Sequence, residues 1–160
     1  KRATKMNTNS TIIDILRQRK ETIAVAESVT GGEMAAKISE VPGASKVFLG
    51  GVVAYSVESK IRDLDVSAKI IEEFGVYSEA VAAEMAQGIR SRFGSDWAIG
   101  ITGVAGPGPD YEVAPGSIWI AILGPAGVQN LQLSLTGTRQ QIRNGAVTSA
   151  LATLERILTL

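Results

Sequence analysis

The sequence predicts an α/β protein with three layers, α/β/α, built on a mixed, mainly parallel sheet of about five to six strands. Short apolar segments rich in β-branched residues alternate with segments of helical period, which is typical of βα units. The last two predicted strands are joined by Gly124-Pro125-Ala126-Gly127, which indicates a hairpin and an antiparallel part of the sheet. At 160 residues, we expect a tail over residues 1–9 and a single domain over residues 10–160.

The N-terminal part of that domain contains a predicted helix, a strand and a second helix. Ser10 is expected to cap the first helix, which ends near Gln18 and has its isoleucines and leucine on one face. Residues 22–26 are short, apolar and rich in β-formers, which favours a buried strand. The next helix is expected over residues 32–39, and Pro42-Gly43 ends it.

The middle of the chain contains a predicted strand followed by two helices. Residues 47–56 form the strand, and the pair Gly50-Gly51 inside it indicates a bulge or a close backbone approach. The helices are expected after Ser67 and Ser78, which cap them, and they end before Gly75 and Gly94. Their repeated apolar residues indicate core positions, and an oligomer interface is the alternative.

The C-terminal part contains the third buried strand, a hairpin and a long helix. The strand covers residues 97–102, and a loop rich in Gly and Pro follows it over residues 103–115. The hairpin strands cover 117–123 and 128–135, and the alternation in the second predicts one solvent-exposed face. Thr138 with Gln141 forms a capping box for a last helix that ends near Leu158.

The composition excludes several classes of site. Without His or Cys, the chain has no Ser-His-Asp triad, no Cys nucleophile, no disulfide, and no zinc site based on imidazole or thiolate. An enzyme built from it needs a Lys, a carboxylate, a Tyr or a held water as its base. A metal bound by carboxylates alone stays open at this point.

The charge and hydropathy patterns concern partners and location. Lys and Arg together number 16, as do Asp and Glu, so the net charge is zero and a nucleic-acid partner is not expected. The chain lacks an apolar run of about 18 residues, so a membrane span is not expected either. The absence of cysteine and of a signal-peptide pattern favours a cytoplasmic location.

Two segments that follow predicted strands are candidates for ligand binding. Glu27–Gly32 and Thr102–Gly108 come after strands whose carboxyl ends form the usual ligand site of an open α/β sheet. Backbone N–H groups at a helix N-terminus favour phosphates, carboxylates or an oxyanion. The alternative is that Ser28 and Thr30 cap the helix, although a cap does not need Gly31-Gly32. Walker A and GxGxxG patterns are both missing, so an ATPase or a nicotinamide-dependent dehydrogenase is not expected.

Tyr55 and Lys60 lie at and just beyond the end of the second predicted strand. One interpretation is an interface Tyr and a solvated Lys. The other is a base for a Ser nucleophile, because Lys is the plausible base in a chain without His. A free Lys has a pKa of about 10.4, and burial in a closed pocket can lower it to about 7–8.

Five segments resemble, in order, the motifs of the CinA C-terminal domain family, which includes nicotinamide mononucleotide deamidases. The resemblance spans about residues 10 to 158. The matching segments are Ala26–Gly32, Gly51–Tyr55 with Lys60, Gly75–Glu79, Thr102–Pro107 and Gly137–Arg139.

This resemblance implies an amidohydrolase that converts nicotinamide mononucleotide and water to nicotinic acid mononucleotide and ammonia. It implies that Ser28 is the nucleophile, that Lys60 is its base, and that Tyr55 orients the pair or shares the proton transfer. It further implies a homo-oligomer that needs neither a metal nor a cofactor. The implied substrate-binding residues are Glu27, Thr30, Gly31, Gly32, Thr102, Gly103, Ala105, Gly106 and Arg139.

Within that set, the backbone at residues 30–32 would form an oxyanion hole or hold the substrate, and Arg139 would bind the phosphate. The sequence also departs from the family pattern. Val57 stands where Asn is frequent, Thr138 replaces an Asp, and residues 112–115 lack a Lys. These departures keep an alternative open, in which the chain is a catalytically inactive relative that binds a nucleotide or regulates.

Overall fold

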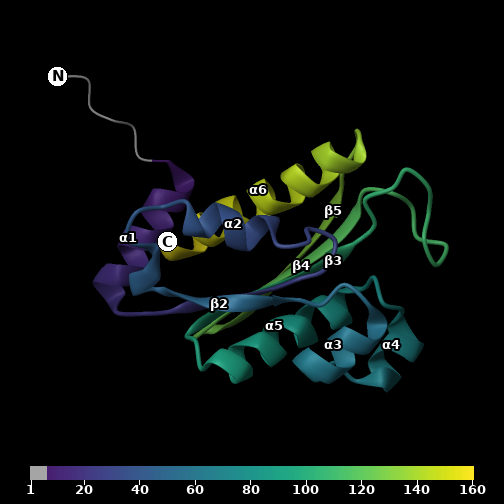
Figure 1. Ribbon diagram of the computed structural model, residues 1–160, viewed down its shortest axis with the longest axis horizontal. Coiled ribbons are helices and arrows are strands. Elements are labelled where there is room, and N and C mark those ends of the chain that lie inside the picture. Colours follow the sequence, from purple (N-terminus) through teal and green to yellow (C-terminus); the bar gives the residue numbers. More distant parts are fainter. Residues whose placement is uncertain (1–6) are drawn as a thin grey trace.

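The computed structural model describes residues 7–160 and shows one sheet between two layers of helices (Figure 1). The strand order is β2-β1-β3-β4-β5. Strands β1 (Ile23–Glu27), β2 (Phe48–Val53) and β3 (Trp97–Gly103) pair in parallel, whereas β4 (Ser117–Gly124) is antiparallel to β3 and to β5 (Gly127–Ser134). All strands except β4 therefore point the same way, and the predicted mixed, mainly parallel sheet is confirmed.

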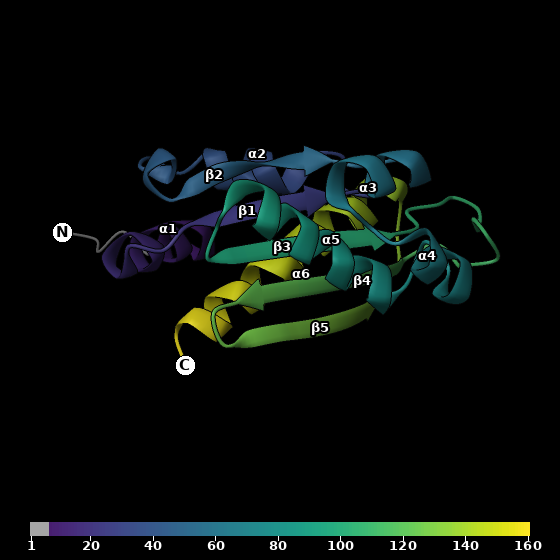
Figure 2. The ribbon, with the colours of Figure 1, turned by 90° about the horizontal axis from the view of Figure 1, so that it is seen from below.

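The helices divide between the two faces of the sheet (Figures 1 and 2). On one face lie α1 (Thr8–Arg19), α2 (Glu33–Ser39) and α6 (Arg139–Leu158); on the other lie α3 (Val57–Leu64), α4 (Ala68–Phe74) and α5 (Glu79–Phe93). Each layer buries its own apolar cluster against the sheet, so the three-layer prediction is confirmed as well.

The two faces of β3 differ in side-chain size. Ile99 and Ile101 point into the cluster beneath α1 and α6, whereas Ala98 belongs to the cluster beneath α5. A Cβ added at Gly100 would lie 2.3 Å from the carbonyl oxygen of Ala82 in α5. Small residues therefore let α5 approach the sheet closely, which fixes the loop that precedes it at the carboxyl ends of the parallel strands.

At the start of the chain, the first helix begins at a different residue from the one that the sequence predicts. Helix α1 begins at Thr8, and its cap is Asn7, whose side-chain oxygen accepts a hydrogen bond of 2.9 Å from the Ser10 N–H. The prediction that Ser10 is the cap is wrong, because Asn7 is an equally good capping residue and lengthens the helix by nearly one turn. Residues 1–6 of the predicted tail lie outside the described part of the chain.

A second difference is larger, because the predicted strand over residues 47–56 ends three residues early and a helix that the sequence did not predict, α3, follows it. Strand β2 ends at Val53, and Ser56 caps α3 by accepting from the Ser59 N–H at 3.1 Å. The Ser59 hydroxyl in turn accepts from the Ser56 N–H at 3.1 Å, which closes a capping box. Capping boxes usually have Glu or Gln at this third position, so the sequence pattern conceals the helix. Helix α3 carries Lys60 on its buried side.

The glycine pair in β2 fulfils both parts of its prediction. The pairing of β2 with β1 skips one residue between Phe48 and Gly50, which is an irregularity of the bulge type. A Cβ at Gly51 would lie 2.3 Å from the carbonyl oxygen of Val25, so the two backbones approach closely there.

The remaining predicted caps and turns are confirmed. Ser67 and Ser78 cap α4 and α5, and Thr138 forms a capping box with Gln141 at the start of α6. The hairpin turn lies between β4 and β5, and β5 exposes one face to solvent. Within residues 7–160, none of the helices has the length and apolar character that crossing a membrane requires.

Candidate active site

A cavity of about 330 Å³ opens beyond the carboxyl ends of β1 and β3. Figure 2 shows α3, α4 and the long loop between β3 and β4 at this same end of the sheet. The cavity is lined by Ser28, Val29, Tyr55, Tyr77, residues 103–110 and Arg139. Both sequence-predicted loops therefore meet at one concave site, as the strand order requires.

Ser28 and Lys60 form a buried contact at the inner wall of this cavity. Their side chains are 3% and 1% exposed, and Lys60 Nζ lies 2.9 Å from Ser28 Oγ. The Nζ atom also lies 3.0 Å from the carbonyl oxygen of Ala54 and 3.3 Å from that of Tyr55. The interpretation of Lys60 as a solvated surface residue is thus wrong. Strand β1 delivers the serine, and the first turn of α3 delivers the lysine.

The environment of Lys60 changes its protonation. Desolvation by burial lowers the pKa of Lys60 from its ordinary value of 10.5 to about 8. A neutral amine donates two hydrogen bonds and accepts one. The carbonyls of Ala54 and Tyr55 can take the two donated bonds, which leaves the nitrogen lone pair for the Ser28 hydroxyl. The same pocket that discourages the ammonium therefore suits the free amine.

The helix that follows Ser28 is capped by neither Ser28 nor Thr30. The Glu27 carboxylate accepts from the backbone N–H of Met34 at 2.8 Å and of Ala35 at 3.0 Å, so Glu27 caps α2 from the end of β1. The Thr30 hydroxyl also donates to this carboxylate, at 2.6 Å. The interpretation of Ser28 and Thr30 as helix caps is therefore wrong, and the Ser28 hydroxyl faces Lys60 instead.

The backbone between Ser28 and α2 forms a tight turn. The Ser28 N–H donates to the Ile101 carbonyl at 3.0 Å and extends the β1–β3 ladder, while the Gly31 N–H donates to the Ser28 carbonyl at 3.0 Å. Gly31 and Gly32 have backbone φ angles of 59° and 104°, a region that residues with a side chain rarely adopt. The glycine pair thus allows the turn that presents Ser28 at the strand end.

Arg143 in α6 holds this turn from behind, a contact that the sequence interpretation missed. Its Nε donates to the Val29 carbonyl at 3.2 Å, and its Nη2 donates to the Thr30 carbonyl at 3.1 Å. Because C=O and N–H point in opposite directions in a trans peptide, these bonds fix the directions of the Thr30 and Gly31 N–H groups. The available signal was its spacing of four from Arg139, which places both on one helix face.

Arg139 and Tyr55 contact each other at the opposite wall. Arg139 Nη1 donates to the Gly106 carbonyl at 2.7 Å, and Nη2 donates to the Tyr55 hydroxyl at 2.9 Å. The Tyr55 hydroxyl is thus directed to Arg139, and the contact of Tyr55 with Lys60 is made by its carbonyl oxygen. Thr138, which replaces the Asp of the family pattern, caps α6 immediately before Arg139.

The structure divides the other predicted substrate-binding residues into two groups. Gly103, Ala105 and Gly106 line the cavity. Thr102 is fully buried, and its hydroxyl donates to the Val76 carbonyl at 3.4 Å. Glu27, Thr30 and Thr102 are buried and do not line the cavity. Gly31 is exposed and Gly32 is half-buried, and both also lie outside the cavity lining.

Comparison with known proteins identifies the family of this chain. The family model for the CinA C-terminal domain matches residues 5–158. The chain belongs to the CinA family. It is 42% identical over 147 residues to a CinA-like protein of Frankia casuarinae, which covers 92% of this chain and 34% of the relative. A CinA-like protein of Prochlorococcus marinus is 43% identical over 152 residues, or 93% of this chain and 35% of the relative. The chain thus spans about a third of the length of the curated CinA relatives it matches.

Solved CinA structures share the fold over nearly the whole chain. A CinA superfamily protein from Klebsiella pneumoniae has a TM-score of 0.92 and 30% identity, covering 96% of this chain and 99% of that one. A CinA superfamily protein from Escherichia coli has a TM-score of 0.91 and 29% identity, covering 96% and 89%. The predicted family and fold class are confirmed.

One lining residue, Tyr77, was missed by the sequence interpretation. It directly precedes Ser78, the cap of α5, and its hydroxyl donates to the carboxylate of Asp110 in the β3–β4 loop. Burial and this hydrogen bond both raise the pKa of Tyr77, so the phenol stays protonated. Its ring also meets Tyr111 edge to face, with centroids 6.0 Å apart and planes at 61°.

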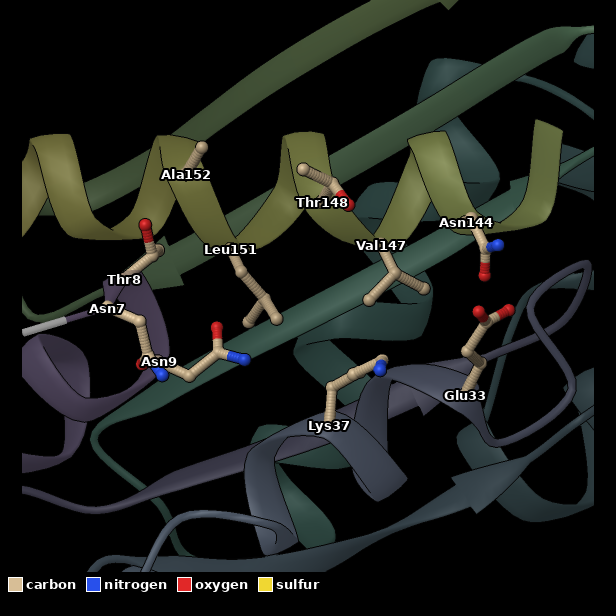
Figure 3. A pocket seen from close by; sticks show the side chains of 10 residues that line it. All are labelled: Asn7, Thr8, Asn9, Glu33, Lys37, Asn144, Val147, Thr148, Leu151 and Ala152. Atoms are coloured by element: carbon tan, nitrogen blue, oxygen red, sulfur yellow. The ribbon is translucent and has the colours of Figure 1, made fainter. Parts of the chain in front are cut away.

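A second cavity, of about 480 Å³, lies between α1, α2 and α6 (Figure 3). Glu33 and Lys37 of α2 and Asn144 of α6 point into it. Although it is the larger of the two, it contains neither Ser28 nor Lys60. The candidate active site of this CinA domain is therefore the smaller cavity.

Proposed function

We propose that this chain is an amidohydrolase that converts nicotinamide mononucleotide and water to nicotinic acid mononucleotide and ammonia, with Ser28 as nucleophile and Lys60 as base. The contact of 2.9 Å between these two buried side chains, at the wall of a cavity that Arg139 also lines, carries the proposal. Membership of the CinA family supports a hydrolase of this type.

The first half of the reaction forms an ester with Ser28. The neutral Lys60 amine takes the hydroxyl proton while Oγ bonds to the carboxamide carbon, and the carbonyl π electrons move to the oxygen. The Lys60 ammonium then gives its proton to the amide nitrogen. The oxyanion re-forms the carbonyl as the C–N bond breaks; the electron pair of that bond stays on nitrogen, and ammonia leaves the Ser28 ester.

The second half restores the serine. A water attacks the ester carbon while Lys60 takes one of its protons. Lys60 returns this proton to Ser28 Oγ as the C–O bond breaks, and the carboxylic acid is released. A base with a pKa near 8 suits both directions of transfer, because it is neither too weak to accept the proton nor too strong to return it.

The two walls of the cavity have different roles in this proposal. Val29 lines the cavity, and Arg143 fixes the direction of the Val29–Thr30 peptide through the Val29 carbonyl; the N–H of this peptide stabilises the oxyanion together with the Lys60 ammonium. On the outer wall, Arg139 uses one N–H on Gly106 and one on Tyr55, and its other donors bind the phosphate. The backbone of residues 103–106 surrounds the rest of the nucleotide.

The direct test is ammonia release from nicotinamide mononucleotide by the purified chain, with nicotinic acid mononucleotide measured in parallel. Ser28→Ala is expected to abolish release, and Ser45→Ala, which changes an exposed serine outside the cavity, serves as the matched control. Full activity in Ser28→Ala would sink the mechanism.

The inactive-relative alternative is supported by the departures from the family pattern, namely Val57, Thr138 and the lack of a Lys in residues 112–115. Calorimetry separates the two functions. Binding of the mononucleotide without turnover by the unmodified chain would establish the alternative, whereas turnover removes it.

A further inference from the structure

The outer part of the catalytic cavity is built from aromatic rings and one carboxylate. Tyr77 and Asp110 line it together, and Tyr111 packs edge to face on Tyr77. Asp110 is held twice. Its carboxylate accepts from the Tyr77 hydroxyl, and its backbone exchanges hydrogen bonds of 3.1 and 2.9 Å with Val113. Tyr77 comes from the loop before α5 and Asp110 from the loop between β3 and β4, so their hydrogen bond connects two separate loops at the cavity wall.

We propose that Tyr77 and Asp110 make this site selective for a carboxamide carried on a positively charged aromatic ring, over the same carboxamide on a neutral ring. The inference rests on the proposed function, since the pyridine ring of nicotinamide mononucleotide carries such a charge. It names the feature of the substrate that the outer wall recognises.

The size of the cavity places the ring against this wall. A carboxamide attacked by Ser28 is bonded directly to its ring, and the whole cavity measures about 330 Å³. Ser28, Tyr77 and Asp110 all line that one space. The ring of a bound substrate therefore lies between the nucleophile and the aromatic wall.

The charges around the cavity favour a cation at this place. An aromatic face attracts a cation through its quadrupole, and a nearby carboxylate adds a direct attraction. The phenol of Tyr77 stays protonated, so it keeps its hydrogen bond to Asp110 and leaves the carboxylate as the negative charge of the wall. Before the attack by Ser28, Lys60 is a neutral amine, and Arg139 donates to the Gly106 carbonyl and the Tyr55 hydroxyl, so neither basic side chain directs a positive charge at the ring.

The Tyr77 hydroxyl prepares this wall before a substrate arrives. Its hydrogen bond to Asp110 fixes the orientation of both side chains, which reduces the ordering cost of binding.

The test compares two ligands that share ribose and phosphate and differ in ring charge. The probes are nicotinamide mononucleotide and its neutral 1,4-dihydro form, and calorimetry on the Ser28→Ala chain measures both affinities without turnover. We expect this chain to prefer the charged ring. Tyr77→Leu and Asp110→Asn should each lower the affinity ratio by about 2- to 30-fold, the range of cation–π contacts from exposed to desolvated sites.

Two further variants give the comparison its controls. Tyr77→Phe keeps the ring and should lose less of the ratio than Tyr77→Leu. Glu112→Gln removes an exposed carboxylate from the same loop, outside the cavity lining, and should leave the ratio unchanged. Asp110→Asn replaces one atom of an exposed side chain, so this variant is expected to fold. It therefore tests the inference even if Tyr77→Leu does not fold.

The outcomes separate the two proposals. If nicotinamide mononucleotide is bound and hydrolysed but the ratio is the same with Asp110→Asn and with the Tyr77 variants, only the selectivity inference is overturned. A ratio that falls equally in Glu112→Gln also overturns it, because general charge then explains the effect. Absence of both binding and ammonia release in the unmodified chain overturns the proposed function and this inference with it.

Discussion

The inner and outer walls of the cavity differ in how they hold their polar groups. On the inner wall, Ser28 and Lys60 are 3% and 1% exposed and come from regular elements, strand β1 and helix α3. On the outer wall, Tyr55 is 58% exposed, and the loop residue Tyr111, which packs on Tyr77 at the rim, is 71% exposed. Burial shifts the pKa of Lys60, whereas the outer groups are oriented mainly by hydrogen bonds and ring contacts. In the proposed function, proton transfer therefore depends on the desolvated wall and recognition on the solvated one.

The largest expected effect comes from removing the titrating group of the inner wall. Lys60→Met should lower kcat for ammonia release by about 10²- to 10⁴-fold, the usual contribution of a general base. Lys60→Arg should be as inactive, because a guanidinium stays protonated and accepts no proton. Lys37→Met, in which an exposed lysine of α2 is changed in the same way, is the matched control. Activity in Lys60→Arg near that of the unmodified chain would exclude Lys60 as base.

The pH profile of the unmodified chain sharpens the same point. The lowered pKa means that Lys60 is neutral and competent above about pH 8 and protonated below it. The rate constant kcat/KM should therefore fall as the pH drops through about 8, and it should be nearly level above that value. A profile that stays flat between pH 6 and pH 9 would show that a different group takes the proton.

A substitution of Arg143 tests whether the inner wall depends on a residue that contacts the Ser28 turn without lining the cavity. Arg143→Gln removes the charged clamp on the carbonyls of Val29 and Thr30, so the oxyanion donors lose their fixed direction. We expect kcat to fall by about 10- to 100-fold, the order expected of a misplacement near 1 Å, while KM changes little. Arg143→Lys should recover part of kcat. Arg156→Gln, an exposed change on the same helix, controls for charge. An increase in KM with unchanged kcat would assign Arg143 to substrate binding instead.

The contrast between the walls also explains which features the sequence revealed. The strands, the glycine turns and most caps follow from local patterns, so the sheet and the loop around Ser28 were predictable. Helix α3 was missed because Ser59 replaces the usual Glu or Gln of a capping box. The burial of Lys60 depends on that helix, and no local pattern contains it.

Contacts between elements that are distant in the sequence were the other feature that the sequence did not predict. The resemblance pointed to Thr102 and Tyr55, but whether a side chain faces the cavity depends on what packs against it. The Thr102 hydroxyl donates to Val76 in the loop before α5, and the Tyr55 hydroxyl accepts from Arg139 in α6. These partners lie 26 and 84 residues away along the chain. Arg143, which is separated from Val29 by 114 residues, was missed for the same reason.

The smallest expected effect separates the two functional groups of Tyr55. Its carbonyl oxygen contacts Lys60 on the inner wall, whereas its hydroxyl contacts Arg139 on the outer one. Tyr55→Phe keeps the first contact and removes the second. We therefore expect KM for nicotinamide mononucleotide to rise by about 2- to 10-fold, as for the loss of one hydrogen bond, with kcat nearly unchanged.

This variant is a direct test of the comparison between the walls, because it tests the proton-transfer role that family resemblance suggests for Tyr55. If the hydroxyl relays a proton, kcat must fall by 10²-fold or more and the limb near pH 8 must move. Arg139→Gln supplies the matched measurement, since it removes the other partner of the same bond. A rise of KM in both variants without loss of kcat, larger in Arg139→Gln because that variant also loses the phosphate contact, would place Tyr55 with Arg139 in recognition and leave the chemistry to Ser28 and Lys60.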